Sequence, residues 1–158
     1  MKRHGLIVVM IAAMDQLIKL QIRNMPPGKI IYILPGLFSI ESCVNTGAAF
    51  SMLSGHTMLI IWISLLLLAA ILVYAMKKLR LTPVSWIMME LLVGGGIGNL
   101  FDRLLFAGVT DYIRLQFIDF PVFNLADIAI TVSISVLMIL LLTDTLEEPL
   151  EDKGESDY

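Results

Sequence analysis

Four long apolar stretches constrain the fold of this chain more than any other feature. They cover approximately residues 5–22, 58–76, 84–106 and 125–143. A helix needs roughly 20 predominantly apolar residues to cross the hydrocarbon layer of a bilayer, which is about 30 Å thick. Each stretch approaches that length. We therefore expect an all-α membrane protein with four transmembrane helices, forming a single domain over residues 1–146.

The composition supports a membrane location and excludes several classes of protein. Of the 158 residues, 58% are hydrophobic and 16% are charged, whereas a soluble domain is roughly a quarter charged. The polar residues are too few to cover a soluble surface. One cysteine and two histidines make a His/Cys zinc site improbable, and no basic patch indicates nucleic-acid binding. We expect neither a metal nor a cofactor.

The basic residues predict the orientation of the chain, because cytoplasmic loops carry an excess of lysine and arginine. Two of them precede the first apolar stretch and three fill the link between the second and third: Lys2, Arg3, Lys77, Lys78 and Arg80. Both flanks are then cytoplasmic, and four spans also return the C-terminus to the cytoplasm. The acidic tail, residues 147–158, is expected to be disordered.

Two segments, about 23–57 and 107–124, remain on the outer side and are too polar to span. The first contains the turn signals Pro26-Pro27-Gly28 and Pro35-Gly36. Its residues 30–34 and 37–44 are rich in β-branched and aromatic side chains. We expect a small extracytoplasmic sheet that rests on the membrane surface.

Polar side chains interrupt the apolar stretches at one predicted depth, in the outer half of the bilayer. A charged group inside a span costs about 2.5–3.5 kcal/mol on insertion scales, so each one needs a reason. The residues concerned come from three stretches and lie near the outer segment that holds Asp111: Asp15, Lys19, Asn99, Asp102, Arg103 and Asp127. Two interpretations stay open. Asp15 with Lys19, and Asp102 with Arg103, are structural ion pairs, or these residues belong to a functional site.

Carboxylates are the reactive groups that this region has in number. Asp111 and Asp127 can fold back to face each other, and two close carboxylates share one proton. One then acts as a base that activates water and the other as an acid. Nucleophilic catalysis is poorly supported, because Ser54 and His56 lack a G-x-S-x-G frame and Cys43 lacks an oriented base.

Four short motifs, in order along the chain, resemble the signature blocks of the type II signal peptidases, also called prolipoprotein signal peptidases. They are Asp15-Gln16-Leu17-Ile18-Lys19, Asn45-Thr46-Gly47-Ala48-Ala49-Phe50, Gly98-Asn99-Leu100-Phe101-Asp102-Arg103 with Gly108-Val109-Thr110-Asp111-Tyr112, and Phe123-Asn124-Leu125-Ala126-Asp127. They cover most of the chain. Tyr112 stands where phenylalanine is more usual in that family.

The resemblance implies a membrane aspartic endopeptidase that removes the signal peptide of bacterial prolipoproteins, cutting before a diacylglyceryl-modified cysteine. It carries the catalytic pair over to Asp111 and Asp127, without a metal. It also implies a monomer in the bacterial cell membrane, in contact with lipids, with the site near the outer face. The supporting residues that it implies are Asp15, Lys19, Asn45, Gly47, Asn99, Arg103 and Asn124.

Two other functions fit the sequence less well. An intramembrane protease of the G-x-G-D type is nearly matched by Gly96-Ile97-Gly98-Asn99, but Asn99 replaces the essential aspartate. A non-enzymatic subunit or small transporter would use the aspartates to carry protons. Such a protein is expected to place acids near the bilayer midplane and to show internal repeats, and neither is evident.

Overall fold

The computed structural model describes residues 5–47, 55–78 and 81–146, which form four helices and a three-stranded sheet. The helices are α1 (Leu6–Arg23), α2 (Thr57–Lys78), α3 (Pro83–Phe106) and α4 (Leu125–Leu142). Their ends agree to within two residues with the four apolar stretches, so the prediction of four helices is confirmed. The tail at 147–158 lies outside the described residues and its predicted disorder stays a prediction.

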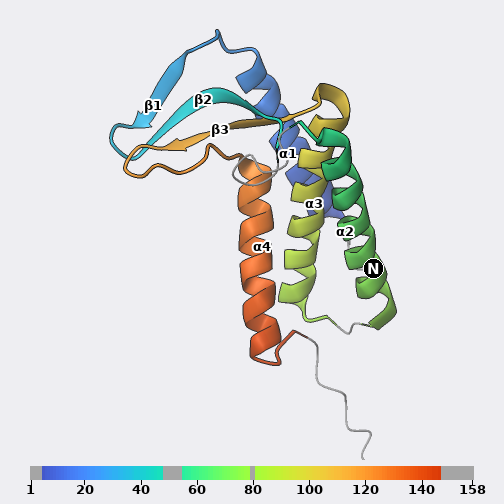
Figure 1. The fold of residues 1–158 in the computed structure, drawn as a ribbon. Coiled ribbons are helices and arrows are strands. Elements are labelled where there is room, and N and C mark those ends of the chain that lie inside the picture. Colours follow the sequence, from blue (N-terminus) through green and yellow to red (C-terminus); the bar gives the residue numbers. More distant parts are fainter. Residues whose placement is uncertain (1–4, 48–54, 79–80, 147–158) are drawn as a thin grey trace, which may run out of the picture.

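The sheet is antiparallel and lies across one end of the helices, at the top of Figure 1. Its strands, in spatial order, are β1 (Ile30–Leu34), β2 (Phe38–Asn45) and β3 (Val109–Leu115). The hairpin of β1 and β2 was predicted. The third strand was not predicted, because residues 107–124 were expected only to lie on the outer side as a segment too polar to span. It pairs with β2 at the centre of the sheet and brings Asp111 opposite Cys43.

The outward faces of the helices are apolar. Leu66 on α2 is 71% exposed and Leu142 on α4 is 77% exposed, and many other large apolar side chains share this pattern. Buried positions on α1 and α3 include charged residues instead. A soluble protein rarely exposes apolar surface on this scale. By length and composition, α3 and α4 are the two described helices able to cross a membrane, and the apolar part of α2 is shorter.

Glycines on α3 allow its neighbours to approach closely. A Cβ atom at Gly95 would lie 2.7 Å from the carbonyl oxygen of Ala126 on α4, and one at Gly98 would lie 2.6 Å from Oδ2 of Asp15 on α1. Only glycine fits at such distances. This glycine-rich run therefore serves helix packing, and it places α3 between α1 and α4. Polar side chains from all three helices consequently meet below the sheet.

Candidate active site

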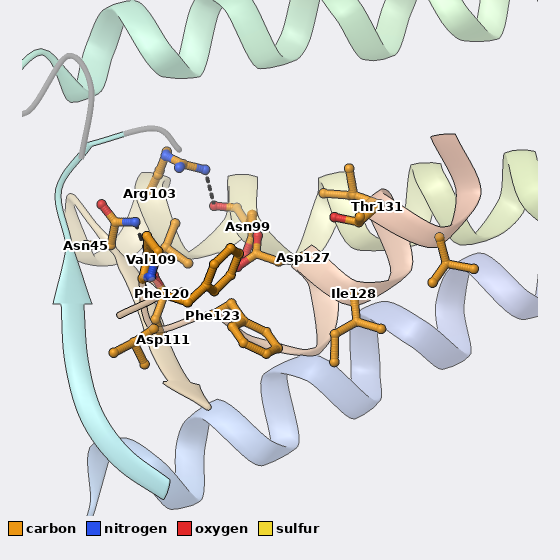
Figure 2. Close-up of a pocket in the computed structure, with 14 residues that line it drawn as sticks. Asn45, Asn99, Arg103, Val109, Asp111, Phe120, Phe123, Asp127, Ile128 and Thr131 are labelled. Carbon is orange, nitrogen blue, oxygen red and sulfur yellow. Dashed lines mark hydrogen bonds between the residues drawn. The ribbon is translucent and has the colours of Figure 1, made fainter. Parts of the chain in front are cut away.

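A pocket of about 520 Å³ opens between the sheet and the adjacent ends of α3 and α4. Asp111 and Asp127 both line it, together with Asn45, Asn99 and Arg103. Figure 2 shows these side chains gathered at the polar end of the pocket, with Ile128 and Thr131 farther along α4. The rest of the lining is largely apolar and comes from the start of β3, the segment before α4 and α4 itself: Val109, Phe120, Pro121, Val122, Phe123, Ile130 and Val132.

Asp111 lies in the pocket because the side chains of a strand alternate between the two faces of the sheet. Successive side chains of β3 point to opposite faces of the sheet, so its neighbours turn away from Asp111. Oδ1 of Asp111 accepts a hydrogen bond from Asn124 Nδ2 at 2.6 Å, and Oδ2 accepts one from Asn45 Nδ2 at 3.1 Å. Burial raises the pKa of Asp111 to about 6, and the charge of Asp127 adds to this effect. The two amide donors act in the opposite direction.

Asp127 is the third residue of α4 and forms a capping box with Asn124. Asn124 Oδ1 accepts from the backbone N–H of Asp127 at 2.9 Å, and the backbone N–H of Asn124 donates to Asp127 Oδ2 at 3.2 Å. The other oxygen, Oδ1, accepts from Asn99 Nδ2 at 2.7 Å. Both oxygens of Asp127 are therefore held by N–H donors, which fixes the carboxylate at the start of the helix.

Two asparagine amides connect the aspartates. Asn124 Nδ2 donates both to Asp111 and, at 3.2 Å, to Asn99 Oδ1. Within the described parts of the chain, neither Asp111 nor Asp127 pairs with a lysine or an arginine. The two carboxylates thus share neutral donors and a pocket, an arrangement in which one proton can be shared between them.

Asn45 and Arg103 are oriented through the backbone of Gly47. The Gly47 N–H donates to Asn45 Oδ1 at 2.9 Å, which turns the Asn45 amino group toward Asp111. The Gly47 carbonyl accepts from Arg103 Nη2 at 3.1 Å, and Arg103 Nη1 donates to the Asn99 carbonyl at 3.4 Å. Gly47 therefore contributes backbone groups, whereas the following Ala48 and Ala49 lie outside the described residues.

Behind the pocket, four charged residues form what we call the ion cluster: Asp15, Lys19, Arg23 and Asp102. Lys19 Nζ lies 2.7 Å from Asp15 Oδ2 and 3.4 Å from Asp102 Oδ2, and all three side chains are fully buried. Arg23 Nη1 lies 3.3 Å from Asp102 Oδ1. Lys19 also donates to Asn99 Oδ1 at 2.9 Å. The cluster therefore touches the pocket through Asn99.

Of the two ion pairs that one of the open interpretations proposed, Asp15 with Lys19 is present, whereas Asp102 pairs with Lys19 and Arg23 and not with Arg103. Neighbouring residues on a helix point about 100° apart. Asp102 faces α1 and accepts from the backbone N–H of Thr110 at 2.9 Å, while Arg103 faces the pocket.

Several residues of this region were missed from the sequence. Arg23 continues the four-residue spacing of Asp15 and Lys19, which is a signal that identifies it. Gln16 donates to Asp102 Oδ1 at 2.9 Å, and Tyr112 contacts the start of α4 through its hydroxyl. Glu90, a buried acidic residue of α3, accepts from the backbone N–H of Gly5 at 2.7 Å near the start of α1.

Metal ligands were also considered. Across 5–47, 55–78 and 81–146, no group of three or more His, Cys, Asp or Glu residues is arranged to hold a metal ion. The expectation that the chemistry needs no metal concerns the reaction itself and stays a prediction.

Comparison with known proteins identifies the family of the chain. The sequence model for signal peptidase (SPase) II, Peptidase_A8, matches residues 7–143. A lipoprotein signal peptidase of Gloeobacter violaceus is 39% identical over 135 residues, which are 85% of this chain and 78% of that protein. One from Desulfitobacterium hafniense is 37% identical over 147 residues, 90% of this chain and 93% of that protein.

Two solved structures, each described as a bacterial membrane enzyme, share the fold. One is 31% identical, with a TM-score of 0.84, and covers 97% of this chain and 92% of its own. The other is 33% identical, with a TM-score of 0.80, and covers 89% and 92%. On these matches the chain belongs to the signal peptidase II family, a family of aspartic peptidases.

Proposed function

We propose that this protein removes the signal peptides of bacterial prolipoproteins, cleaving before a diacylglyceryl-modified cysteine with Asp111 and Asp127 as the catalytic pair. The observation that carries the proposal is the meeting of these two aspartates in one pocket, each held by amide donors and neither in an ion pair with a lysine or arginine of the described chain. The relatives named above supply the substrate class.

The two aspartates act as a pair that shares one proton. Burial and the charge of Asp127 raise the pKa of Asp111 to about 6, which favours a proton held by the pair before the reaction, and we assign it to Asp111. Asp127 then takes a proton from water as the water oxygen bonds to the scissile carbonyl carbon. The C–N bond breaks when the leaving nitrogen receives a proton from the pair, which returns the pair to one shared proton.

The supporting residues divide by what they touch. Asn45, Asn99 and Asn124 orient the two carboxylates through their amino groups. Arg103 lines the pocket with a fork of donors suited to a substrate carbonyl, and Gly47 fixes its position. Asp15 and Lys19 do not line the pocket. Lys19 donates to Asn99, and Asp15 accepts from the backbone N–H of Ala126 at the start of α4.

The placement in the membrane follows from the same proposal. All four helices cross the cell membrane with both termini in the cytoplasm, and the pocket lies near the outer face beneath the sheet. The apolar wall of the pocket, including Phe123 and Ile128, suits a hydrophobic signal peptide and its attached lipid. The protein acts as a monomer surrounded by membrane lipids.

The test is cleavage by the purified full-length protein in detergent. The substrate is a prolipoprotein peptide that carries diacylglyceryl-cysteine, and the same peptide without the lipid is the control. We expect cleavage just before the lipid-modified cysteine, identified by product mass, and we expect it to persist in chelator. No cleavage would favour a proton-carrying membrane subunit, and loss in chelator would indicate a metal enzyme.

The topology has its own test, because it rests on the basic flanks and not on the site. A tag placed at the C-terminus should survive protease added outside intact cells. Digestion of that tag from outside would overturn the orientation and the placement of the pocket at the outer face.

A further inference from the structure

The first turn of α4 is held by side chains from several elements. The first four N–H groups of a helix have no partner within the helix, and here each one donates to a side chain. Asn124 N–H donates to Asp127 Oδ2, Leu125 N–H to Tyr112 Oη, Ala126 N–H to Asp15 Oδ1 and Asp127 N–H to Asn124 Oδ1. Two of these acceptors belong to α4 and its cap, one to α1 and one to β3.

Tyr112 is the acceptor from β3, and it directly follows Asp111 in the chain. Its side chain is 4% exposed, and its Oη lies 3.1 Å from the backbone nitrogen of Leu125. Its own backbone N–H donates to the carbonyl of Phe123 at 3.0 Å. A single residue therefore fastens the strand that carries Asp111 to the segment and the helix that carry Asp127.

We propose that Tyr112 is a positioning residue of the reaction, whose hydroxyl holds the first turn of α4 against β3 and so sets how far apart Asp111 and Asp127 lie. This inference rests on the proposed function and deepens it. Tyr112 is not among the residues that line the pocket, and its hydroxyl acts through the backbone of Leu125, two residues before Asp127.

The geometry explains why this contact matters for the pair. The side-chain links between the two aspartates run through the amides of Asn99 and Asn124, and the backbone of Ile113 pairs β3 with Phe123, ahead of the helix. The Tyr112 contact instead joins a backbone group of the helix to a buried ring. Burial also raises the pKa of Tyr112 to about 12, so its hydroxyl stays neutral wherever the aspartates titrate.

Tyr112→Phe in the full-length protein tests the proposal, with Tyr32→Phe as the matched control. Tyr32 is 59% exposed on β1 and far from the pocket lining. We expect kcat per folded enzyme to fall on the order of 10-fold in Tyr112→Phe, since small misplacements of reacting groups are costly, while KM stays close to that of the wild type. Tyr32→Phe should match the wild type. A lower melting temperature with unchanged kcat would overturn the proposal and leave a structural role.

A second substitution separates the effect of losing the hydrogen bond to Leu125 from other effects of removing the Tyr112 hydroxyl. Leu125→Pro removes the donor, and proline is well tolerated at the first position of a helix. Asn124, with φ −133° and ψ 179°, already has the extended backbone required before proline. Tyr112→Phe with Leu125→Pro should lose no more kcat than the more affected single variant. Losses that multiply would show two independent effects and overturn the proposal.

A readout without catalysis keeps this inference distinct from the proposed function. Hydrogen exchange at the Leu125 amide should be slow in the wild type and in Tyr32→Phe, and at least about 10-fold faster in Tyr112→Phe, because the amide loses its acceptor. Unchanged exchange at the Leu125 amide would refute the positioning role of Tyr112 even if the protein cleaved no prolipoprotein. Inactive wild type with the exchange difference intact would instead refute the proposed function.

Discussion

Two pairs of aspartates lie at the same end of the helix bundle and have opposite surroundings. Asp15 and Asp102, in the ion cluster, are fully buried and bind Lys19 and Arg23 at 2.7–3.4 Å. Asp111 and Asp127 bind amide and backbone N–H groups and line an open pocket. The residue type is the same, so the difference lies in what neutralises the charge.

This difference distinguishes aspartates that stabilise the fold from aspartates that can take part in a reaction. A carboxylate paired with a buried ammonium group stays ionised and joins two helices, and breaking such a pair is strongly destabilising. A carboxylate held by neutral donors can gain or lose a proton near the working pH. Such a group lowers the stability of the fold but remains reactive. We therefore expect substitutions in the ion cluster to affect folding and substitutions in the proposed catalytic pair to affect turnover.

The largest effect should come from the proposed pair. Asp111→Asn and Asp127→Asn keep the shape of the side chain but remove the shared proton, so each should reduce cleavage by about 10²-fold or more. Both variants should still accumulate in the membrane. The assay follows conversion of a lipid-modified prolipoprotein to its shorter form, with Asp119→Asn, exposed in the segment before α4, as the control.

Near-normal cleavage by either variant would remove the proposed pair from the mechanism. Loss of activity only through loss of protein would move both aspartates into the structural class with Asp15 and Asp102.

Substitutions in the ion cluster should reduce stability and not turnover. Lys19→Met leaves two buried aspartates without their ammonium partner, and we expect unfolding to become easier by about 3–5 kcal/mol. Denaturation in detergent and the yield of membrane protein measure this change. Lys29→Met, at an exposed lysine in the turn before β1, should have no comparable effect.

Asp15→Asn added to Lys19→Met should restore part of the stability, since Asp15, unlike Asp102 with Arg23, has no second cation partner in the ion cluster, and asparagine keeps an acceptor for the backbone N–H of Ala126. If Lys19→Met is stable but inactive, the cluster is part of the reaction and the distinction drawn above fails.

Arg103 tests the distinction between the two regions, because it directly follows Asp102 of the ion cluster in the chain but lines the pocket. Its two terminal nitrogens donate to the carbonyls of Gly47 and Asn99, a fork that lysine cannot reproduce. Arg103→Lys should lose about 10-fold or more in activity while membrane levels stay normal. Normal activity would identify Arg103 as an anchor at the membrane interface instead.

The smallest effect is a pH dependence of stability that arises from Asp111 in the pocket. The pKa of Asp111 is raised to about 6 in the folded protein, above its ordinary value of 3.8. Protonated Asp111 therefore contributes stability that is fully present below about pH 4 and is lost as pH rises through 6. Asp111→Asn should lack this loss, so it should gain in melting temperature relative to the wild type between pH 4 and 7. A constant difference across that range would contradict the raised pKa.

The helices and part of the polar region were accessible from the sequence, for a local physical reason. Apolar runs of about 20 residues identify helices without knowledge of their neighbours, and Asp15 and Lys19 share a face because they are four residues apart. Both features depend on contacts within one element. The pairing of Asp15 with Lys19 was predicted correctly on that basis.

The contacts between elements were not accessible in the same way. Strand β3 forms by pairing with β2, which precedes it by more than sixty residues, and its polar sequence concealed it. Asp102 was assigned to its neighbour Arg103, although the rotation between adjacent helix positions sends it toward α1. The role of the Tyr112 hydroxyl depends on where α4 begins relative to β3, which only the folded chain defines.

The capping box at the start of α4 gives the protein an internal reporter of where the proton resides. Asp127 Oδ2 accepts the backbone N–H of Asn124, and a carboxylate accepts more strongly than a carboxylic acid. Proton transfer to Asp127 should therefore shift the ¹H and ¹⁵N resonances of the Asn124 amide. An inhibitor that protonates Asp127 on binding would be distinguished spectroscopically, at a backbone position, from one that leaves it ionised.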